Sequence, residues 1–435
     1  MPDSAVIVLA IVVLALLIAL RTPVFVALAC SGMVGLYLLQ GIAGLERVPL
    51  ALVSQLQEYT LVAAPMYILL GETLAVSGLG RDLFGTAYRW IGRVPGGLEV
   101  SAIGASTTFG AMSGVSLSSV AVVGPMSVPT MVERGHKPSF ATGSVTASGA
   151  LAMLIPPSLM FILYSSVTGV SVAGLFMGGL FPGLVLAALM GGYVVVAAKL
   201  RPELAPSPAE RFSWAERFRS LGRVLPALLL IVVVLGSIYS GLATPTEAAA
   251  VGALAALLVV GLYYRSLSWR NLWRVLIDTT QVSAGVLAIV GSAFVFTKML
   301  VVVRVPDRLT AFVTGLDVPG YVVLAGVMAI LLLLGCLVDA ASLLLVVTPI
   351  LVPAMKTLGY DPLWLGVLLV VNLEMAVITP PVGLNLYIMK SVAPEIDLAQ
   401  IFRGIVPYLF LEAGLLVLIV AVPQLATWLP ATLGQ

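Results

Sequence analysis

Long uninterrupted apolar stretches constrain this chain more than any other feature of its sequence. A helix needs roughly 20 apolar residues to cross about 30 Å of hydrocarbon, and two such stretches, 6–20 and 24–45, open the sequence. Further stretches are centred near residues 68, 150, 185, 233, 254, 290, 328, 375 and 416. Because 60% of the residues are hydrophobic and only 10% are charged, too little polar surface remains to cover soluble domains. We therefore predict an all-α, multi-pass membrane protein with about eleven spans.

The few polar features outside these stretches agree with a membrane protein. The first stretch follows an acidic start and no basic leader, so we expect a retained helix rather than a cleaved signal peptide. Cys30 and Cys336 lie in apolar segments, where we expect small hydrophobic side chains rather than a disulfide. The net charge of +2 indicates no nucleic-acid partner. Residues 199–224 are rich in arginine and lysine, and the positive-inside rule places them on the cytoplasmic face.

An internal repeat becomes visible when the chain is aligned with itself at an offset of 224 residues. The alignment needs no gap and places Pro125, Pro129, Pro138, Pro156 and Pro157 on Pro349, Pro353, Pro362, Pro380 and Pro381. Prolines are uncommon in membrane helices and have specific backbone consequences, so five in register indicate a duplication. The basic segment lies between the two copies and is the natural linker. Transporters often use such repeats in inverted orientation, with the substrate site near the bilayer midplane.

Each copy contains two elements that cannot be simple membrane spans. The first is rich in small residues and prolines, and we expect re-entrant hairpins at about 100–131 and about 335–356. The second is a double proline, which removes backbone donors and breaks a helix, so we expect unwound helices at 149–158 and 372–385. Carbonyl oxygens freed at such a break can ligate sodium, and the N-terminus of a half-helix can face a carboxylate.

At these residues the chain resembles the large membrane subunit (M, DctM-like) of the tripartite ATP-independent periplasmic (TRAP) transporters. The resemblance covers nearly the whole length. Its motifs in the first copy are Ala64-Pro65-Met66, Pro95-Gly96-Gly97, Ser113-Gly114-Val115-Ser116 and Ile155-Pro156-Pro157-Ser158. Those in the second copy are Ala243-Thr244-Pro245-Thr246-Glu247, Thr348-Pro349-Ile350, Asn372-Leu373-Glu374 and Thr379-Pro380-Pro381-Val382-Gly383-Leu384-Asn385.

The resemblance implies an inverted-repeat architecture in which a transport domain moves like an elevator against a scaffold. On this basis we expect N-terminal scaffold helices at 1–58, the first repeat at 59–198, the linker at 199–224, scaffold helices with an amphipathic interfacial arm at 225–281, and the second repeat at 282–428. It also implies a bacterial inner-membrane location. The expected partners are a small TRAP membrane subunit (Q), a soluble periplasmic substrate-binding protein (P) and the lipid bilayer.

The resemblance further implies two sodium sites, with sodium as the co-transported ion and no organic cofactor. Carried over to this chain, the sodium-binding residues are Ser113, Gly114, Val115, Ser116, Ala152, Ile155 and Pro156 in the first copy, and Asp339, Ala340, Ala376, Thr379 and Pro380 in the second. Many relatives have Gly-Ser-Ser or a similar triplet at the first hairpin tip where this chain has Gly114-Val115-Ser116. For Asp339, capping of the following half-helix is an equal alternative to sodium coordination.

For substrate contact we consider five polar residues close to these breaks: Ser118, Ser158, Asn372, Glu374 and Asn385. Asn372 and Glu374 have a structural alternative, hydrogen bonding between helices. The expected cargo is an organic acid such as a C4-dicarboxylate, a sialic acid or another carboxylate, and the sequence does not distinguish among them.

The sequence disfavours three other classes of protein. An enzyme is disfavoured because the motifs Gly-x-Ser-x-Gly and His-Glu-x-x-His are absent, and ATP-driven transport because no Walker sequence is present. A channel would be expected to build its filter from oligomeric symmetry, whereas this chain repeats within itself. The nearest alternative is a stand-alone sodium- or proton-coupled carboxylate transporter with the same hairpin design.

Overall fold

A computed structural model describes residues 2–206, 210, 212–316 and 318–434 of the chain. Within these ranges the regular elements are all helices. Those of the first half are α1 (Asp3–Ala19), α2 (Val24–Gln40), α3 (Ile42–Leu56), η1 (Tyr59–Val62), α4 (Ala63–Ala75), α5 (Leu79–Ile91), α6 (Gly97–Ser113), α7 (Ser116–Glu133), α8 (Pro138–Ala150), η2 (Leu151–Met153), α9 (Leu159–Thr168) and α10 (Val172–Leu200).

The second half begins after the linker. Its elements are α11 (Trp214–Tyr239), α12 (Pro245–Leu258), η3 (Val259–Tyr263), α13 (Trp269–Val302), α14 (Val305–Thr314), α15 (Gly320–Gly335), α16 (Ala340–Thr357), α17 (Pro362–Ile378), α18 (Leu384–Val392), α19 (Leu398–Ala421) and α20 (Gln424–Thr432). Helix α12 starts with a capping box, in which Thr244 and Glu247 satisfy each other's backbone N–H groups and Pro245 holds the first helical position.

The helix boundaries follow the sequence repeat. Adding 224 to the bounds of α7 (116 and 133) gives 340 and 357, which are the bounds of α16. The same addition takes α9 (159 and 168) to 383 and 392, one residue from the start of α18 and on its last residue. The duplicated sequence therefore forms duplicated elements, each copy with a hairpin (α6–α7, α15–α16) and a broken helix (α8–α9, α17–α18).

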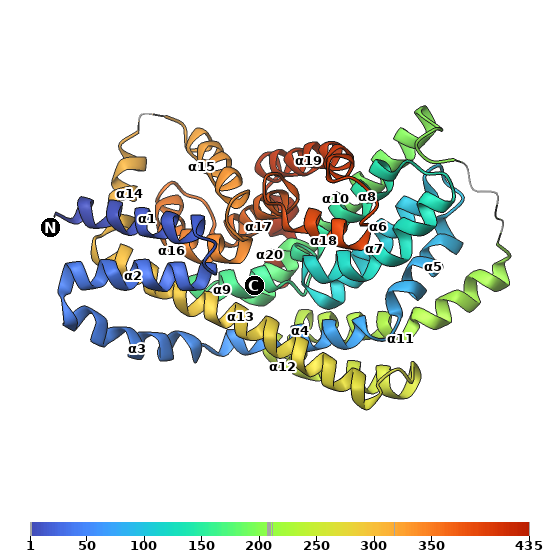
Figure 1. The fold of residues 1–435 in the computed structure, drawn as a ribbon, viewed down its shortest axis with the longest axis horizontal. Helices are drawn as coiled ribbons and strands as arrows, with labels where there is room; N and C mark the ends of the chain where they lie inside the picture. The colour runs from blue at the N-terminus through green and yellow to red at the C-terminus, as the bar shows by residue number, and fades with distance from the viewer. Residues whose placement is uncertain (1, 207–209, 211, 317, 435) are drawn as a thin grey trace.

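The two copies are interlocked by reciprocal packing. Helix α7 of the first hairpin packs against α18, the half-helix that follows the break of the second copy, and α16 packs against α9, its equivalent in the first copy. In Figure 1 the first hairpin lies at the right and the second at the left, with α9, α17 and α18 between them. Each candidate site is thus built from segments far apart in the sequence.

Several helices are suited by length and composition to cross a membrane. Six are long and apolar enough in the described part of the chain. A seventh span is possible if Tyr59–Ala75 and Leu79–Ile91, a pair with a bend of 70° between them, counts as one. Five apolar helices of 10–17 residues accompany them in the described part of the chain. The all-helical membrane fold is confirmed, whereas the count of about eleven spans stays a prediction.

Two of the predicted segments are partly helical, and the domain division itself stays a prediction. Within the predicted linker 199–224, α10 continues to Leu200 and α11 begins at Trp214, so that Arg217, Arg219 and Arg223 lie on a helix. The predicted interfacial arm falls at the start of α13 and is not a separate element. It is continuous with the following span in the 34-residue helix α13, since no proline or glycine interrupts 269–284.

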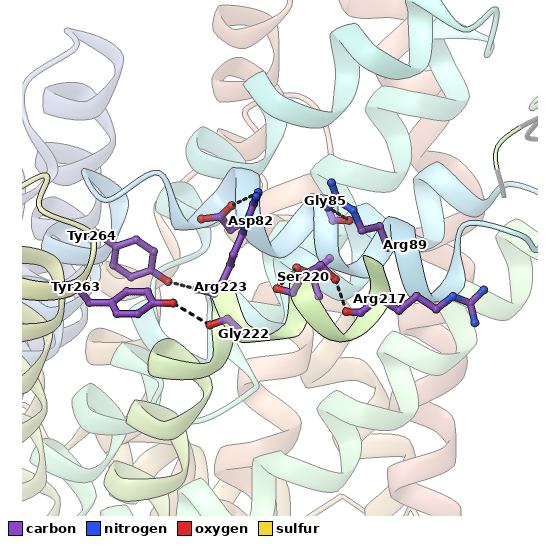
Figure 2. A network of polar contacts seen from close by, with 10 residues as sticks. Asp82, Gly85, Arg89, Arg217, Ser220, Gly222, Arg223, Tyr263 and Tyr264 are labelled. Carbon is purple, nitrogen blue, oxygen red and sulfur yellow. Dashed lines mark hydrogen bonds and ion pairs between the residues drawn. The ribbon is translucent and has the colours of Figure 1, made fainter. Parts of the chain in front are cut away.

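A polar network joins three helices that lie outside the hairpins and broken helices (Figure 2). Thr86 on α5 donates to the carbonyl of Ser220 on α11 over 3.1 Å. The hydroxyls of Tyr263 and Tyr264, at the end of α12–η3, donate to the carbonyls of Gly222 and Arg223 over 2.9 and 2.8 Å. These side-chain bonds to backbone carbonyls link α5 and α12 to α11.

Candidate functional site

The first hairpin turns at Gly114 and Val115. Gly114 ends α6 in the left-handed conformation, with φ of +64°, and Val115 is extended before α7 begins. The carbonyl of Gly114 accepts a hydrogen bond from the backbone N–H of Leu159 over 3.3 Å. A Cβ atom on Gly114 would lie 2.4 Å from the carbonyl oxygen of Pro157. The tip therefore presses directly against the first helix break, and only glycine fits there.

Two serines flank this tip in different surroundings. Ser113 is buried, and its hydroxyl has no hydrogen-bond partner. The hydroxyl of Ser116 lies 2.7 Å from the side-chain amide nitrogen of Asn385 on α18. Two residues further on, the hydroxyl of Ser118 donates to Glu72 on α4 over 3.5 Å. The tip thus offers an unused oxygen at Ser113 and a contact to the other copy at Ser116.

The first broken helix is enclosed. After α8 the chain makes one 3₁₀ turn and then runs without helix to Ser158, and every residue from 151 to 158 is buried. The Ser158 hydroxyl donates to the carbonyl of Met153, which secures the bend. Ala152 lies against the first hairpin, because a Cβ atom on Gly110 would come within 2.9 Å of its Cα. Of the predicted residues, Ala152 therefore lies against the first hairpin, whereas the side chain of Ile155 packs on Gly183 of α10.

The second hairpin is built in a similar way with different side chains. Asp339 caps α16, since its Oδ1 accepts from the backbone N–H of Ser342 over 2.9 Å. The carbonyl of Cys336 at the tip accepts from the N–H of Val382 in the second break, over 3.2 Å. The hydroxyl of Ser342 is buried without a partner. Of the two roles considered for Asp339, capping is the one visible here.

The second broken helix is open. Helix α17 ends at Ile378, Thr379 is extended, and α18 starts at Leu384. The Thr379 hydroxyl donates to the carbonyl of Met375 over 2.6 Å. Pro380 and Pro381 are exposed, unlike their buried equivalents in the first copy. Both double prolines contain a cis peptide bond.

The expected unwinding at 372–385 is corrected by the structure, which keeps α17 helical through Ile378. Asn372 and Glu374 consequently lie inside a helix rather than in the break. The amide of Asn372 donates to the carbonyl of Met328 on α15 over 3.2 Å, a bond between helices. Double prolines act only on the turn that precedes them, because each ring clashes with the carbonyl four residues back, and Asn372 lies eight residues before the first proline.

Two buried acidic groups escaped the sequence analysis. Glu412 on α19 is fully buried beside Glu374 on α17, and no carboxylate oxygen of either residue has a hydrogen-bond partner. In the first turn of α6, Glu99 contacts His136 over 2.6 Å, and both are buried. The sequence did carry a signal for Glu412, which stands alone in an apolar run. An acid within a membrane span is costly without a role or a partner, so its position indicated a buried functional or paired carboxyl group.

Two cavities lie near the end of α9. One borders the α9–α10 connection, and the other borders the hairpin helix α16. The larger, about 640 Å³, lies between η1, the α9–α10 connection and the start of α12, and its lining includes Glu58, Ser165 and Thr246. The smaller, about 270 Å³, lies between α13 and α16. Ser166 and Val167 line both, so the two cavities adjoin.

The comparisons with known proteins agree on one family. The model of the family described as "Tripartite ATP-independent periplasmic transporter, DctM component" matches residues 11–425. The C4-dicarboxylate TRAP transporter large permease protein of Pseudomonas aeruginosa is 34% identical over 379 residues, which cover 87% of this chain and 88% of that protein. The protein of the same name from Rhodobacter capsulatus is 31% identical over 98% of this chain and 100% of its own. The chain belongs to the DctM family of TRAP transporter large permeases.

A solved structure supports the fold of this TRAP permease independently. The transporter MtrF of Neisseria gonorrhoeae superimposes with a TM-score of 0.61, at 14% sequence identity, over 93% of this chain and 94% of that one. This likeness concerns the fold alone. Together with the family and the apolar helices, it makes the protein a multi-pass inner-membrane transporter subunit and not an enzyme.

Proposed function

We propose that this permease subunit imports an organic acid by coupling its movement to sodium, with hairpins and broken helices of both copies moving as one body against the frame of α1–α5 and α11–α13. The observation that carries the proposal is the reciprocal packing of each hairpin on the half-helix of the other copy. Within each copy the hairpin tip also contacts that copy's own helix break, where carbonyl oxygens released from helical bonding can ligate a hard cation.

The proposed sodium ligands are the carried-over residues at these two pairings. In the first, the unpartnered hydroxyl of Ser113 adds a side-chain oxygen to the backbone carbonyls near Ile155. In the second, Thr379 is the equivalent of Ile155, and the unpartnered hydroxyl of Ser342, which is the equivalent of Ser118 and not one of the carried-over residues, adds a side-chain oxygen. Buried hydroxyls without a partner are costly, and an ion between tip and break would satisfy them.

The names of the relatives support an anionic or polar cargo without fixing it. Relatives are named for C4-dicarboxylates and 2,3-diketo-L-gulonate, which are carboxylates, and another for isethionate. The isethionate relative of Oleidesulfovibrio alaskensis is named permease protein DctMQ, and this chain covers 64% of its length. We therefore propose a small Q-type membrane subunit and a periplasmic binding protein as partners, with the binding protein contributing to substrate choice.

Uptake into proteoliposomes tests this function. The vesicles contain the chain and its small-subunit partner, and a panel of labelled succinate, N-acetylneuraminate and gluconate is offered with and without the binding protein and an inward sodium gradient. Uptake that requires both additions supports the proposal. Uptake that needs sodium but no binding protein supports the stand-alone carrier instead, and uptake indifferent to sodium overturns the coupling.

Two substitutions test the ligand assignment. Ser116→Ala and Thr379→Ala should weaken sodium-dependent uptake more than they weaken insertion of the protein into the membrane. The readout is the sodium concentration for half-maximal uptake. Normal transport by both variants at limiting sodium would show that the side-chain assignments are wrong.

A further inference from the structure

The cleft between α13 and α16 has the side-chain chemistry of an anion site. Its lining from α13 comes from Val290, Ala293, Phe294, Thr297, Lys298 and Val301, which are spaced at three and four residues and so share one helix face. Leu345 and Pro349 of the second hairpin form the opposite wall. The volume of about 270 Å³ is enough for part of a small organic acid.

Each polar side chain of this cleft can donate a hydrogen bond. Lys298 lines it and takes part in none of the ion pairs found among the described residues. Its ammonium lies 5.7 Å from the ring centroid of Phe294, another lining residue. Lys298 is exposed, and both side chains also line a smaller cavity between α13 and the helices α2 and α3. No aspartate or glutamate is among the described residues that line the cleft. A cation in such a position favours an anion as its partner.

Two buried side chains add unsatisfied donors beside the lysine. Gln55 and Thr297 both line the cleft and are more than nine-tenths buried. The amide nitrogen of Gln55 and the hydroxyl of Thr297 have no hydrogen-bond partner. Leaving a buried donor unpaired costs free energy. Ammonium, amide and hydroxyl together match the acceptor-only oxygens of a carboxylate.

The cleft lies on the way to the second hairpin tip. Ser342, Leu345 and Pro349 are spaced by three and four residues, so the cleft wall on α16 continues along one face to the hydroxyl of Ser342. The distance from Pro349 to Ser342 along the helix is roughly 10 Å. In the other direction Ser166 and Val167 connect the cleft with the larger cavity.

We propose that Lys298, Gln55 and Thr297 form a frame-side subsite that binds the carboxylate of the transported acid while the second hairpin faces it. The inference rests on the proposed function, since it takes an organic acid as the cargo. Its two walls belong to different parts of the molecule, α13 of the frame and α16 of the hairpin. Movement of the hairpin separates them, so the subsite exists in one position of the hairpin and releases the carboxylate in the other.

The alternative is that Lys298 only extends its charge to the membrane surface, as lysines near helix ends do. An electrostatic measurement separates the two without any transport assay. Ser166→Cys is placed in a background in which Cys30 and Cys336 are replaced, and the thiol is modified with an anionic sulfonatoethyl or a cationic trimethylammonioethyl methanethiosulfonate. We expect Lys298→Gln to lower the ratio of anionic to cationic rates about ten-fold, as for a charge at short range.

The matched control is Lys356→Gln. It removes an exposed lysine from the last turn of α16, the helix that forms the other wall of the cleft. It should leave the ratio unchanged. A ratio that is the same with and without Lys298 overturns the proposal. This readout stays valid if uptake proves to be independent of sodium, so a failure of the subsite and a failure of sodium coupling can be told apart.

Transport kinetics supply the second test, with labelled succinate or the panel acid that is taken up in its place. Lys298→Gln should raise KM for the acid about ten-fold or more, the usual effect of losing a charged hydrogen bond. Lys298→Arg should restore most of it, and the sodium concentration for half-maximal uptake should stay as in the unmodified protein. An unchanged KM in Lys298→Gln, or an equal loss in Lys298→Arg, contradicts a carboxylate at this position.

Discussion

The two broken helices have matching sequences and opposite surroundings. Residues 151–158 of the first break are all buried, whereas Pro380 and Pro381 of the second are exposed. The first tip is held by a side chain of the other copy, Asn385, while the second tip is held by its own cap at Asp339. Duplication has thus produced two sites of one design, one enclosed by protein and one accessible, and the difference lies in what packs around them.

The largest expected difference concerns the glycines of the two sites. Gly114→Ala places a Cβ against the backbone oxygen of Pro157, whereas Gly383→Ala meets first the movable end of Leu386, at 2.5 Å. Both residues have positive φ, which costs a non-glycine residue about 1–2 kcal/mol. The clash should add about 1–3 kcal/mol at Gly114 and less at Gly383, where the nearest backbone atom, the Thr379 oxygen, would be 3.0 Å away. Thermal unfolding of the purified variants in detergent checks this, and equal losses would mean that the first tip is no more tightly packed than the second break.

Access to the two breaks can be measured directly by thiol labelling. Ile155 and Thr379 are equivalent at the offset of 224, and Ile155 is buried while Thr379 is partly exposed. In the cysteine-replaced background, Thr379→Cys should react with a hydrophilic maleimide about 30-fold faster than Ile155→Cys, as expected if the latter waits for a local opening of about 2 kcal/mol. Similar rates would show that the first break opens as readily as the second.

The contact between the two copies at the first tip should have a smaller effect. Ser116→Ala leaves the buried amide of Asn385 without its nearest partner and should cost about 1–3 kcal/mol of stability. Ser391→Ala on the same half-helix is the control, because its exposed hydroxyl only bonds back to Ile388. A double-mutant cycle with Asn385→Ala measures the coupling. Additive losses would mean that the two side chains do not hold the tip together.

The cap of the second tip should show the smallest effect and separates the two roles of Asp339. Asn caps a helix about as well as Asp, so Asp339→Asn should change stability by less than about 0.5 kcal/mol, whereas Asp339→Ala should cost about 1 kcal/mol. Sodium activation of uptake is measured on both variants. If Asp339→Asn is stable yet needs far more sodium, the carboxylate is a sodium ligand in addition to a cap.

Proline and glycine carried most of the correct predictions. Their effects are local and steric, so the double prolines and the turn at Gly114 indicated both breaks and the first tip from sequence alone. The repeat also predicted which elements would be equivalent. It could not predict that Asn385 contacts Ser116, because that contact depends on how two half-helices more than 260 residues apart pack together.

Charged residues within apolar runs were the hardest to interpret. Lys298 and Glu412 occur singly in sequences that are otherwise ordinary spans, and the character of each depends on neighbours from other helices. The exposure of the second break was equally hard to predict, because it too depends on neighbours from other helices. Pro156 and Pro380 are equivalent in the repeat and each begins a double proline, so their different burial is decided by the surrounding helices rather than by the prolines themselves.

The length of α13 has a consequence for the lipid around the protein. Its 34 residues extend over roughly 50 Å, well beyond a hydrocarbon core of about 30 Å, so the helix must either tilt steeply or project from the bilayer. Trp269 and Trp273 mark one end and Lys298 lies near the other. Hydrophobic mismatch therefore acts on the same helix that carries one wall of the α13–α16 cleft, and acyl-chain length becomes a variable that changes how the cargo meets the frame.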